Sequence, residues 1–186
     1  MRAAALACLL FLSSAVDAQP PARSHDALVD AAERGDAARV RELIKAGGDV
    51  NWQNARKDSA FLVAGARGHT EVVRLTLAAG ADLKSTNRYG GTALIPACHY
   101  GHVDTVRELL KTKIDVDHVN NLGWTALLEA VILGDGGPRH LEIVGLLLER
   151  GASPNLADRD GVTPFVHAKK RGYAEMARRI AAAGGR

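Results

Sequence analysis

Apolar positions along most of the chain recur at helical spacing, in short runs that glycines interrupt. In the stretch 102–111, Val103, Val106 and Leu109 fall three residues apart, which places them on one side of a helix. The stretch 92–100 has the same spacing, and the glycine between the two stretches ends the first helix. The pattern therefore predicts two short helices joined by a tight turn.

This helix pair repeats along the chain. Three kinds of marker residue recur every 33 residues, with one step of 38 before the last copy. They are the glycines Gly35, Gly68, Gly101, Gly134 and Gly172, the residues Asp26, Ser59, Thr92, Thr125 and Thr163, and the residues Asn54, Asn87, Asn120 and Asp158. Because all three share one period and one five-residue insertion, the sequence predicts an array of similar units.

Each marker has a local physical role. Asp, Ser or Thr at the second marker is a good N-cap, because its oxygen accepts a free amide of the first helical turn. Asn followed by Gly is typical of a tight turn between units. Helices this short are marginal alone, so each unit needs its neighbours. We expect a domain over residues 19–186, with repeats at about 21–53, 54–86, 87–119 and 120–157, an insertion at 135–139, and a C-terminal cap at 158–186.

Several segments resemble ankyrin repeats. The segments are DGVTPF at 160–165, GTAL at 91–94, GHVDTVRELL at 101–110, GHTEVVRL at 68–75 and GADL at 80–83. The resemblance covers nearly all of residues 21–186. It implies an all-α repeat solenoid of paired short antiparallel helices joined by β-hairpin-like loops.

The chain departs from the family pattern at three kinds of position. Only Pro164 keeps the proline that usually follows the capping Thr, and the usual histidine is replaced by Leu62, Ile95, Leu128 and Val166. We therefore expect the stack to depend more on apolar contact. Lys57 stands where a turn glycine is expected, which puts the geometry of the first hairpin in question. Pro96 lies late in a first helical turn and is expected to delete one backbone hydrogen bond.

The first 18 residues have the pattern of a signal peptide. A basic start at Arg2 precedes the apolar run Ala3–Leu12, and Val16-Asp17-Ala18 supplies small residues for cleavage after Ala18. The run is too short to span a bilayer, which takes about 20 apolar residues, so no membrane insertion is expected after cleavage. A lipoprotein alternative centred on Cys8 has too few residues before it. Together with the ankyrin resemblance, the segment predicts an exported, periplasmic bacterial protein.

Composition excludes several classes of function. The chain is 47% hydrophobic and 24% charged with a formal charge of +3, which matches neither a disordered chain nor a dense basic nucleic-acid binder. It has no glycine-rich phosphate loop, no paired metal-binding cysteines and no usable Ser-His-Asp set. The segment 134–138 resembles the surroundings of a serine nucleophile but lacks the serine, so it is interpreted as a loop. We expect neither an enzyme nor a cofactor.

Cys98 and three histidines offer an alternative function. Cys98 occupies a position that small residues fill in other repeats, which favours a buried core residue. His69, His102 and His140 each precede a second helix, which predicts a ladder along the solenoid and hydrogen bonding at helix starts rather than a metal cluster. The alternative is a stress-related metal or redox protein that uses Cys98 and these histidines.

In ankyrin proteins, partners usually dock on the concave face formed by the hairpin tips and the last turn of each first helix. On that face we expect an apolar centre of aromatic and leucine side chains with a basic rim. The predicted partner-binding residues are Arg56, Arg67, Arg88, Tyr89, His99, Tyr100, Leu122, Trp124, Leu133, Arg159, Lys170 and Arg171. The resemblance and the rim predict a protein partner with an acidic patch and no nucleic acid. Its role would be that of an inhibitor, an immunity-type protein or an accessory protein of a periplasmic enzyme.

Overall fold

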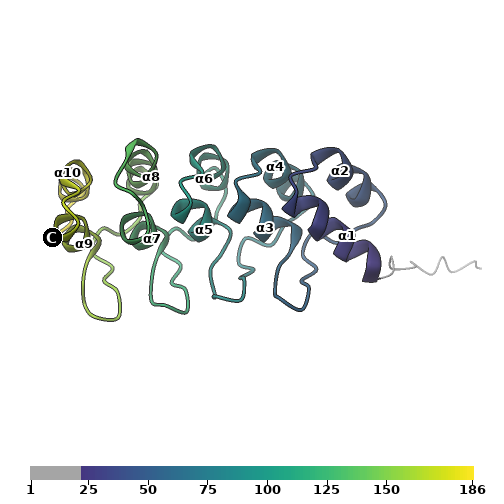
Figure 1. Cartoon of the computed structure of the whole chain (residues 1–186), viewed down its shortest axis with the longest axis horizontal. Helices are drawn as coiled ribbons and strands as arrows, with labels where there is room; N and C mark the ends of the chain where they lie inside the picture. The colour runs from purple at the N-terminus through teal and green to yellow at the C-terminus, as the bar shows by residue number, and fades with distance from the viewer. Residues whose placement is uncertain (1–21) are drawn as a thin grey trace, which may run out of the picture.

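A computed structural model describes residues 22–186, so the predicted signal peptide and cleavage site lie outside the described residues. Helices make up the regular structure of this region, and they follow one another in pairs (Figure 1). The pairs are α1 (Ala22–Glu33) with α2 (Ala37–Lys45), α3 (Ala60–Arg67) with α4 (Thr70–Ala78), α5 (Leu94–His99) with α6 (Val103–Leu110), α7 (Ala126–Ile132) with α8 (Pro138–Glu149), and α9 (Pro164–Lys170) with α10 (Ala174–Ala182).

The pairs stack side by side into an elongated solenoid (Figure 1). The first helices of the pairs form one row, the second helices form another, and the long loops between pairs project from the row of first helices. The loops have hairpin-like bonds, such as the Asn87 amide to the Gly91 carbonyl at 3.0 Å, although residues 22–186 contain no strand. The predicted all-α repeat solenoid is confirmed.

Three of the five predicted N-caps form. The hydroxyls of Ser59, Thr125 and Thr163 each accept a hydrogen bond from the amide three residues later, at 3.2, 3.2 and 3.4 Å. The prediction was wrong at Asp26, which lies inside α1, because this helix begins a turn earlier than its counterparts. It was also wrong at Thr92, whose buried hydroxyl has no hydrogen-bond partner.

Pro96 explains the different start of α5. In α3 and α7, the Ser59 and Thr125 carbonyls accept the first helical bonds at 3.0 and 2.9 Å. The residue that would donate the equivalent bond to Thr92 is Pro96, which has no amide hydrogen. The helix therefore begins at Leu94, one residue later in the repeat register, and the expected loss of a backbone bond is confirmed.

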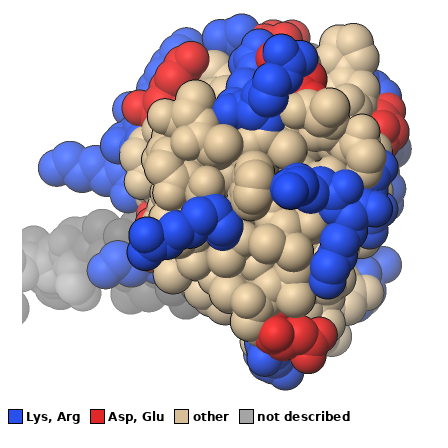
Figure 2. Space-filling model, turned by 90° about the vertical axis from the view of Figure 1, so that its left-hand side faces the viewer, with Lys and Arg blue, Asp and Glu red and all other residues tan. Residues whose placement is uncertain are grey.

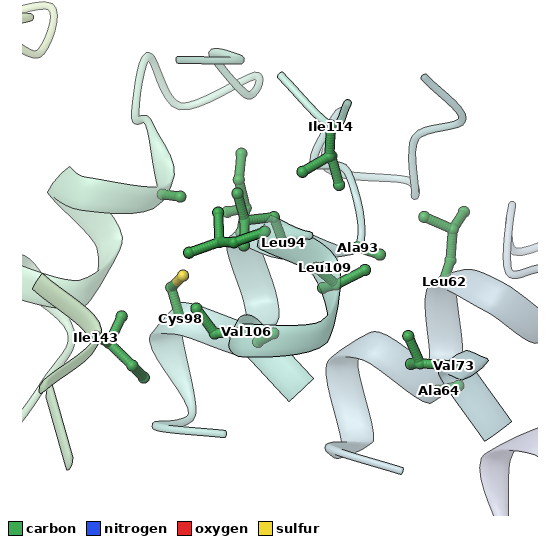
Figure 3. Packing of buried hydrophobic residues seen from close by; sticks show 14 of the residues in the cluster. Leu62, Ala64, Val73, Ala93, Leu94, Cys98, Val106, Leu109, Ile114 and Ile143 are labelled. Carbon is green, nitrogen blue, oxygen red and sulfur yellow. The ribbon is translucent and has the colours of Figure 1, made fainter. Parts of the chain in front are cut away.

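The core between the repeats consists mainly of Ala, Val, Leu and Ile side chains. Figure 3 shows Leu94, Cys98, Val106 and Leu109 packed together between neighbouring helices. Each of the four is fully buried. The interpretation of Cys98 as a core residue is confirmed.

Aromatic rings bind each repeat to the one before it. The Nε2 atoms of His69, His102 and His140 hydrogen-bond to the carbonyls of Glu33, Ala66 and His99, at 3.0, 3.2 and 2.8 Å. The predicted bonding at helix starts was wrong, since neither His69 nor His102 bonds to its own helix start. The rings instead bond to carbonyls near the end of the preceding first helix, where the last carbonyls of a helix have no amide donors within that helix.

The insertion changes which glycine makes the turn. In the other repeats the turn glycine has a positive φ, as at Gly101 with 72°, but in the fourth repeat Gly136 takes this conformation with a φ of 70° and Gly134 does not. The last two residues of the predicted insertion 135–139 belong to α8, which begins at Pro138. Tyr173 spans the enlarged turn and donates a hydrogen bond from its hydroxyl to the Gly134 carbonyl at 3.1 Å.

Lys57 leaves the geometry of the first hairpin intact. Its amide donates to the Asn54 carbonyl at 2.8 Å, and the Gly90 amide donates to the Asn87 carbonyl at 2.9 Å in the next hairpin. Lys57 achieves this with a φ of 59°, the only positive φ among the non-glycine residues described. The turn is therefore the same, formed with a residue that disfavours it.

Candidate functional site

A groove of about 510 Å³ lies on the concave face, defined as the surface formed by the hairpin loops and the last turns of the first helices. It extends from the end of α1 to the end of α7 and is lined by loop residues on one side and by α3, α5 and α7 on the other. Eight of the twelve predicted partner-binding residues line it. They are Arg56, Arg67, Arg88, Tyr89, His99, Tyr100, Leu122 and Leu133.

The centre of the groove exposes large apolar side chains. Tyr89, Tyr100, Leu122 and Leu133 are 56%, 54%, 51% and 41% exposed. The Tyr100 ring stacks on that of His99 with centroids 4.2 Å apart, which holds it in one orientation. Exposed aromatic and aliphatic side chains gathered in one hollow mark an interaction site rather than ordinary surface scatter.

The other four predicted residues lie outside the groove lining. Trp124 is half-buried, so a smaller fraction of its side chain is exposed than of Tyr89 or Tyr100. Arg159 donates a hydrogen bond to the Asn121 carbonyl, which links two neighbouring hairpins. Lys170 and Arg171 are exposed at the end of α9.

The groove arginines already have carboxylate partners. Arg67 lies 2.7 Å from Glu33, and Arg56 lies 3.2 Å from Asp58. Arg88 lies 3.5 Å from Asp58. The pKa of Glu33 is lowered mainly by its hydrogen bond from Arg67. This end of the basic rim is therefore an ion-pair network and carries less net positive charge than the arginines alone suggest.

Positive charge is concentrated instead in the last repeat. Residues 163–186 contain 6 of the 24 Lys and Arg residues but only 1 of the 21 Asp and Glu residues. Figure 2 shows the C-terminal end of the solenoid, where Lys and Arg side chains surround a largely uncharged centre. The predicted residues Lys170 and Arg171 belong to this basic segment.

A buried carboxyl group that is not among the predicted site residues lies on the floor of the groove. Glu129, on α7, lines the groove but is only 6% exposed. Its Oε1 accepts a hydrogen bond from Asn120 Nδ2 at 2.8 Å, and its Oε2 lies 3.7 Å from His99 Nδ1. Burial raises the pKa of Glu129 to about 7 and lowers the pKa of His99. Burial therefore shifts both groups toward their neutral forms.

Burial, not residue type, distinguishes Glu129 from its ionisable counterparts in the other repeats. The equivalent positions are occupied by Asp30, Val63, Pro96 and His167. Asp30 is exposed and His167 is half-buried, whereas Glu129 is buried. The repeat register alone therefore does not identify Glu129, because an ionisable side chain also occurs at this position in the first and last repeats.

The groups that suggested metal or redox chemistry are not arranged for it. Cys98 is fully buried, and burial raises the pKa of its thiol well above the usual value, which disfavours the reactive thiolate. Residues 22–186 contain no group of three or more His, Cys, Asp and Glu side chains that could hold a metal ion. The histidines form the predicted ladder and bond to carbonyls.

A second hollow, of about 520 Å³, lies on the side of the second helices and is lined by residues of α4, α6 and α8. Several of its charges are paired within the chain, since Glu108 binds Arg74 at 2.9 Å and Lys111 at 2.8 Å. It has no aromatic lining residue. The concave groove is the better candidate site. No helix among residues 22–186 has the length and apolar character required to cross a membrane.

Comparison with known proteins agrees with this architecture. A family model described as ankyrin repeats (3 copies) matches residues 28–119 and 61–158. The ankyrin repeat protein YahD of Escherichia coli (strain K12) is 52% identical over 56 residues, which cover 30% of this chain and 28% of that protein. The chain therefore matches little more than a quarter of the length of this curated relative.

Two solved structures match over most of the chain. An ankyrin repeat domain from Acinetobacter baumannii AYE is 54% identical with a TM-score of 0.84, covering 86% of this chain and 81% of that one. A second ankyrin repeat protein is 42% identical with a TM-score of 0.80, covering 83% and 78%. Sequence, repeat period and fold agree, and the chain belongs to the ankyrin-repeat family.

Proposed function

We propose that this protein is a binding module that holds another protein in its concave groove and performs no chemistry of its own. The observation that carries the proposal is the gathering of Tyr89, Tyr100, Leu122 and Leu133 in one hollow, each more than 40% exposed. Such side chains supply binding energy when a partner covers them. Ankyrin repeats generally mediate protein–protein interaction, which supports the same function.

The proposal includes a place of action. The basic start, apolar run and small residues before position 19 support export to the periplasm. An exported binding module would act there as an inhibitor, an immunity-type protein or an accessory protein of an enzyme. Sequencing the N-terminus of the protein recovered from a periplasmic fraction tests this, and a start at Gln19 is the expected result. An uncleaved N-terminus at Met1 in the cytoplasmic fraction would contradict it.

The proposed partner has an acidic patch, and we place its contact at the last repeat. The groove arginines bind Glu33 and Asp58, whereas Lys170 and Arg171 make no ion pair with any residue in 22–186. These two side chains are therefore free to attract acidic residues and to speed association at low salt. Replacing both with Gln should slow association and reduce its salt dependence. The corresponding change at Arg67 should have less effect on either.

The groove itself is tested by partner capture. The chain from residue 19 is used as bait in a periplasmic extract, beside a variant with Tyr100→Ala and Leu122→Ala. Val119→Ala with Leu156→Ala is a matched control, because these residues are 51% and 37% exposed but lie outside the groove lining. The groove variant should lose the captured protein and the control should keep it. Equal capture by both variants would contradict the proposed site.

A further inference from the structure

We propose that Glu129 forms a specific subsite on the floor of the groove for a basic side chain, lysine or arginine, of the bound partner. The inference rests on the proposed function, since it names a feature of the partner that the groove would hold. Its starting point is geometric. Glu129 is almost fully buried, lines the groove, and has a carboxyl oxygen that lacks a hydrogen bond to any residue in 22–186.

The free carboxyl oxygen has no cationic partner in the chain. Oε1 is held by Asn120, but the nearest basic group to Oε2 is His99 Nδ1 at 3.7 Å, beyond hydrogen-bond range. Burial lowers the pKa of His99, so this ring is neutral near neutral pH. The groove arginines bind Glu33 and Asp58 instead. A buried carboxylate normally requires a counter-ion, and here a ligand would supply it.

Other titratable groups do not supply that charge. The helices packed against α7 carry five buried or half-buried ones, which are Cys98 and His99 on α5, His140 and Glu142 on α8, and His167 on α9. His140 and His167 each bond to an aspartate of their own repeat, at 2.8 and 2.7 Å. The Cys98 thiol is neutral because burial raises its pKa well above the usual value. None of these groups offers a positive charge to Glu129.

The fold itself does not require a carboxyl group here. Val63 and Pro96 fill the same register position in two earlier repeats, so the solenoid accepts an apolar side chain there. Burial raises the pKa of Glu129 to about 7, which means that its ionised form is disfavoured in the free protein. Asp30, the carboxyl group at this position in the first repeat, is exposed, whereas Glu129 is buried and opposes stability when ionised, which is best explained by a contact made in the complex.

The apolar walls of the groove suit the stem of a basic side chain. Tyr100 and Leu122 line the groove together with Glu129, so the methylene groups of a lysine or arginine would contact them while its charged end reaches the carboxylate. Ion pairing with a carboxyl group that is itself only 6% exposed contributes more than pairing at an exposed surface. Binding would ionise Glu129 and release its proton, so affinity should rise with pH up to the pKa of the free carboxyl group.

The test uses small probes of defined charge. The probes are Nα-acetyl-lysine amide and Nα-acetyl-arginine amide, with Nα-acetyl-norleucine amide as the neutral control of similar shape. The pKa of Glu129 is followed by carbon NMR of labelled glutamate carboxyl groups, assigned by its loss in Glu129→Gln. We expect a pKa of about 7 in the free protein and a fall of about one unit or more with saturating basic probe. The norleucine probe should leave the pKa unchanged.

Binding measurements give a second readout. Glu129→Gln keeps a side chain that can bond to Asn120, so it should fold normally while binding the basic probes about tenfold more weakly or worse above pH 7. Glu129→Val, which copies Val63, should behave in the same way. Equal binding of basic and norleucine probes by the wild type, or unchanged binding by Glu129→Gln, would overturn the subsite.

Failure of the subsite and failure of the proposed function have different signatures. If only the subsite is wrong, the captured partner still depends on Tyr100 and Leu122, but its affinity is the same for wild type and Glu129→Gln at every pH. If the proposed function is wrong, the Tyr100→Ala and Leu122→Ala variant captures the partner as well as the wild type. An affinity that falls as pH rises would show that an acidic group, not a basic one, lies over Glu129.

Discussion

Lys57 has a backbone conformation that glycine has at the same turn position of the later hairpins. A left-handed φ brings the Cβ atom of an L-residue close to its own backbone, at a cost of about 1–2 kcal/mol. The turn persists because Asn54 accepts its hydrogen bonds. The Asn54 carbonyl accepts from the Lys57 amide at 2.8 Å, and the Asn54 side chain accepts from the Arg56 amide at 2.9 Å. The sequence shows that Lys57 replaces the turn glycine of the family, but it does not show whether the turn is kept. The turn is kept because its hydrogen bonds outweigh the local strain.

Replacing Lys57 with glycine should therefore stabilise the protein. Relief of the left-handed strain is partly offset by the greater freedom of glycine in the unfolded chain, which leaves a gain of about 1 kcal/mol. Urea unfolding at neutral pH measures the change. A loss of stability in Lys57→Gly would mean that the lysine side chain makes a contact worth more than the strain.

Two threonines in the same register position should respond in opposite ways to replacement by valine. Thr92 has a buried hydroxyl with no partner, so Thr92→Val removes an unsatisfied polar group and should raise stability by about 1 kcal/mol. Thr125 accepts a bond from the Leu128 amide at 3.2 Å, so Thr125→Val should lower stability by about 1 kcal/mol. Thermal unfolding of the two variants compares them directly. Shifts of the same sign would contradict the assignment of the two hydroxyls.

At the scale of elements, the turn glycines and the histidine rings that pack on them together join neighbouring repeats. At Gly68, with a φ of 74°, an added Cβ atom would lie 2.5 Å from the Nδ1 atom of His102 in the next repeat. Glycine is therefore required here for two reasons: the backbone has a positive φ, and the His102 ring leaves no room for a Cβ atom. The period of 33 residues predicted that both residues recur, but the ring's hydrogen bond to a carbonyl of the preceding repeat depends on stacking, which the spacing does not describe.

Two glycine variants separate these requirements. Gly80 has a φ of 86° and no neighbour within 4 Å of the added Cβ position, so Gly80→Ala should cost only the left-handed strain of about 1 kcal/mol. Gly68→Ala adds displacement of the His102 ring and should cost roughly 3 kcal/mol. The difference in unfolding free energy from urea titration isolates the contact between repeats. Equal costs would mean that the ring moves aside freely.

Prediction of elements from the sequence failed where one repeat differs from the others. Asp26 has the right spacing for an N-cap, yet α1 begins at Ala22, so Asp26 lies inside the helix and cannot cap its start. The insertion moved the turn from Gly134 to Gly136. The spacing of the marker residues does not show which of the two glycines, Gly134 or Gly136, takes the left-handed conformation.

At the scale of the whole molecule, the candidate site was only partly visible in the sequence. The family register brought eight of the twelve predicted residues to one groove, because hairpin tips and helix ends stay in line along the stack. The register did not reveal that Glu33 and Asp58 neutralise groove arginines, or that Glu129 is buried there. Pairing and burial arise only when the repeats are stacked, so the spacing of residues along the chain does not determine them.

The pH dependence of folding should show that buried groups from different repeats act together. Burial lowers the pKa of His99 and His102, so protons bind the unfolded chain more readily and stability falls as pH drops below about 6.5. Glu129 acts in the opposite direction, because its pKa is raised from 4.5 to about 7. The contribution of Glu129 to the free energy of unfolding is complete at low pH, declines as pH rises above 4.5, and is lost near pH 7.

The free energy of unfolding should rise with pH because of the histidines and fall with pH because of Glu129, and Glu129→Gln should remove the second of these effects. Between about pH 4.5 and pH 6.5 the variant should gain stability with rising pH more steeply than the wild type, since only the histidines remain. Above pH 7 it should be more stable by about 3 kcal/mol, which corresponds to the raised pKa of the native carboxyl group. Urea unfolding across this pH range measures both curves, and His102→Gln should flatten the acid branch in either background. Parallel curves for wild type and Glu129→Gln would show that Glu129 ionises normally in the folded protein, which would also remove the physical basis for a cation subsite in the groove.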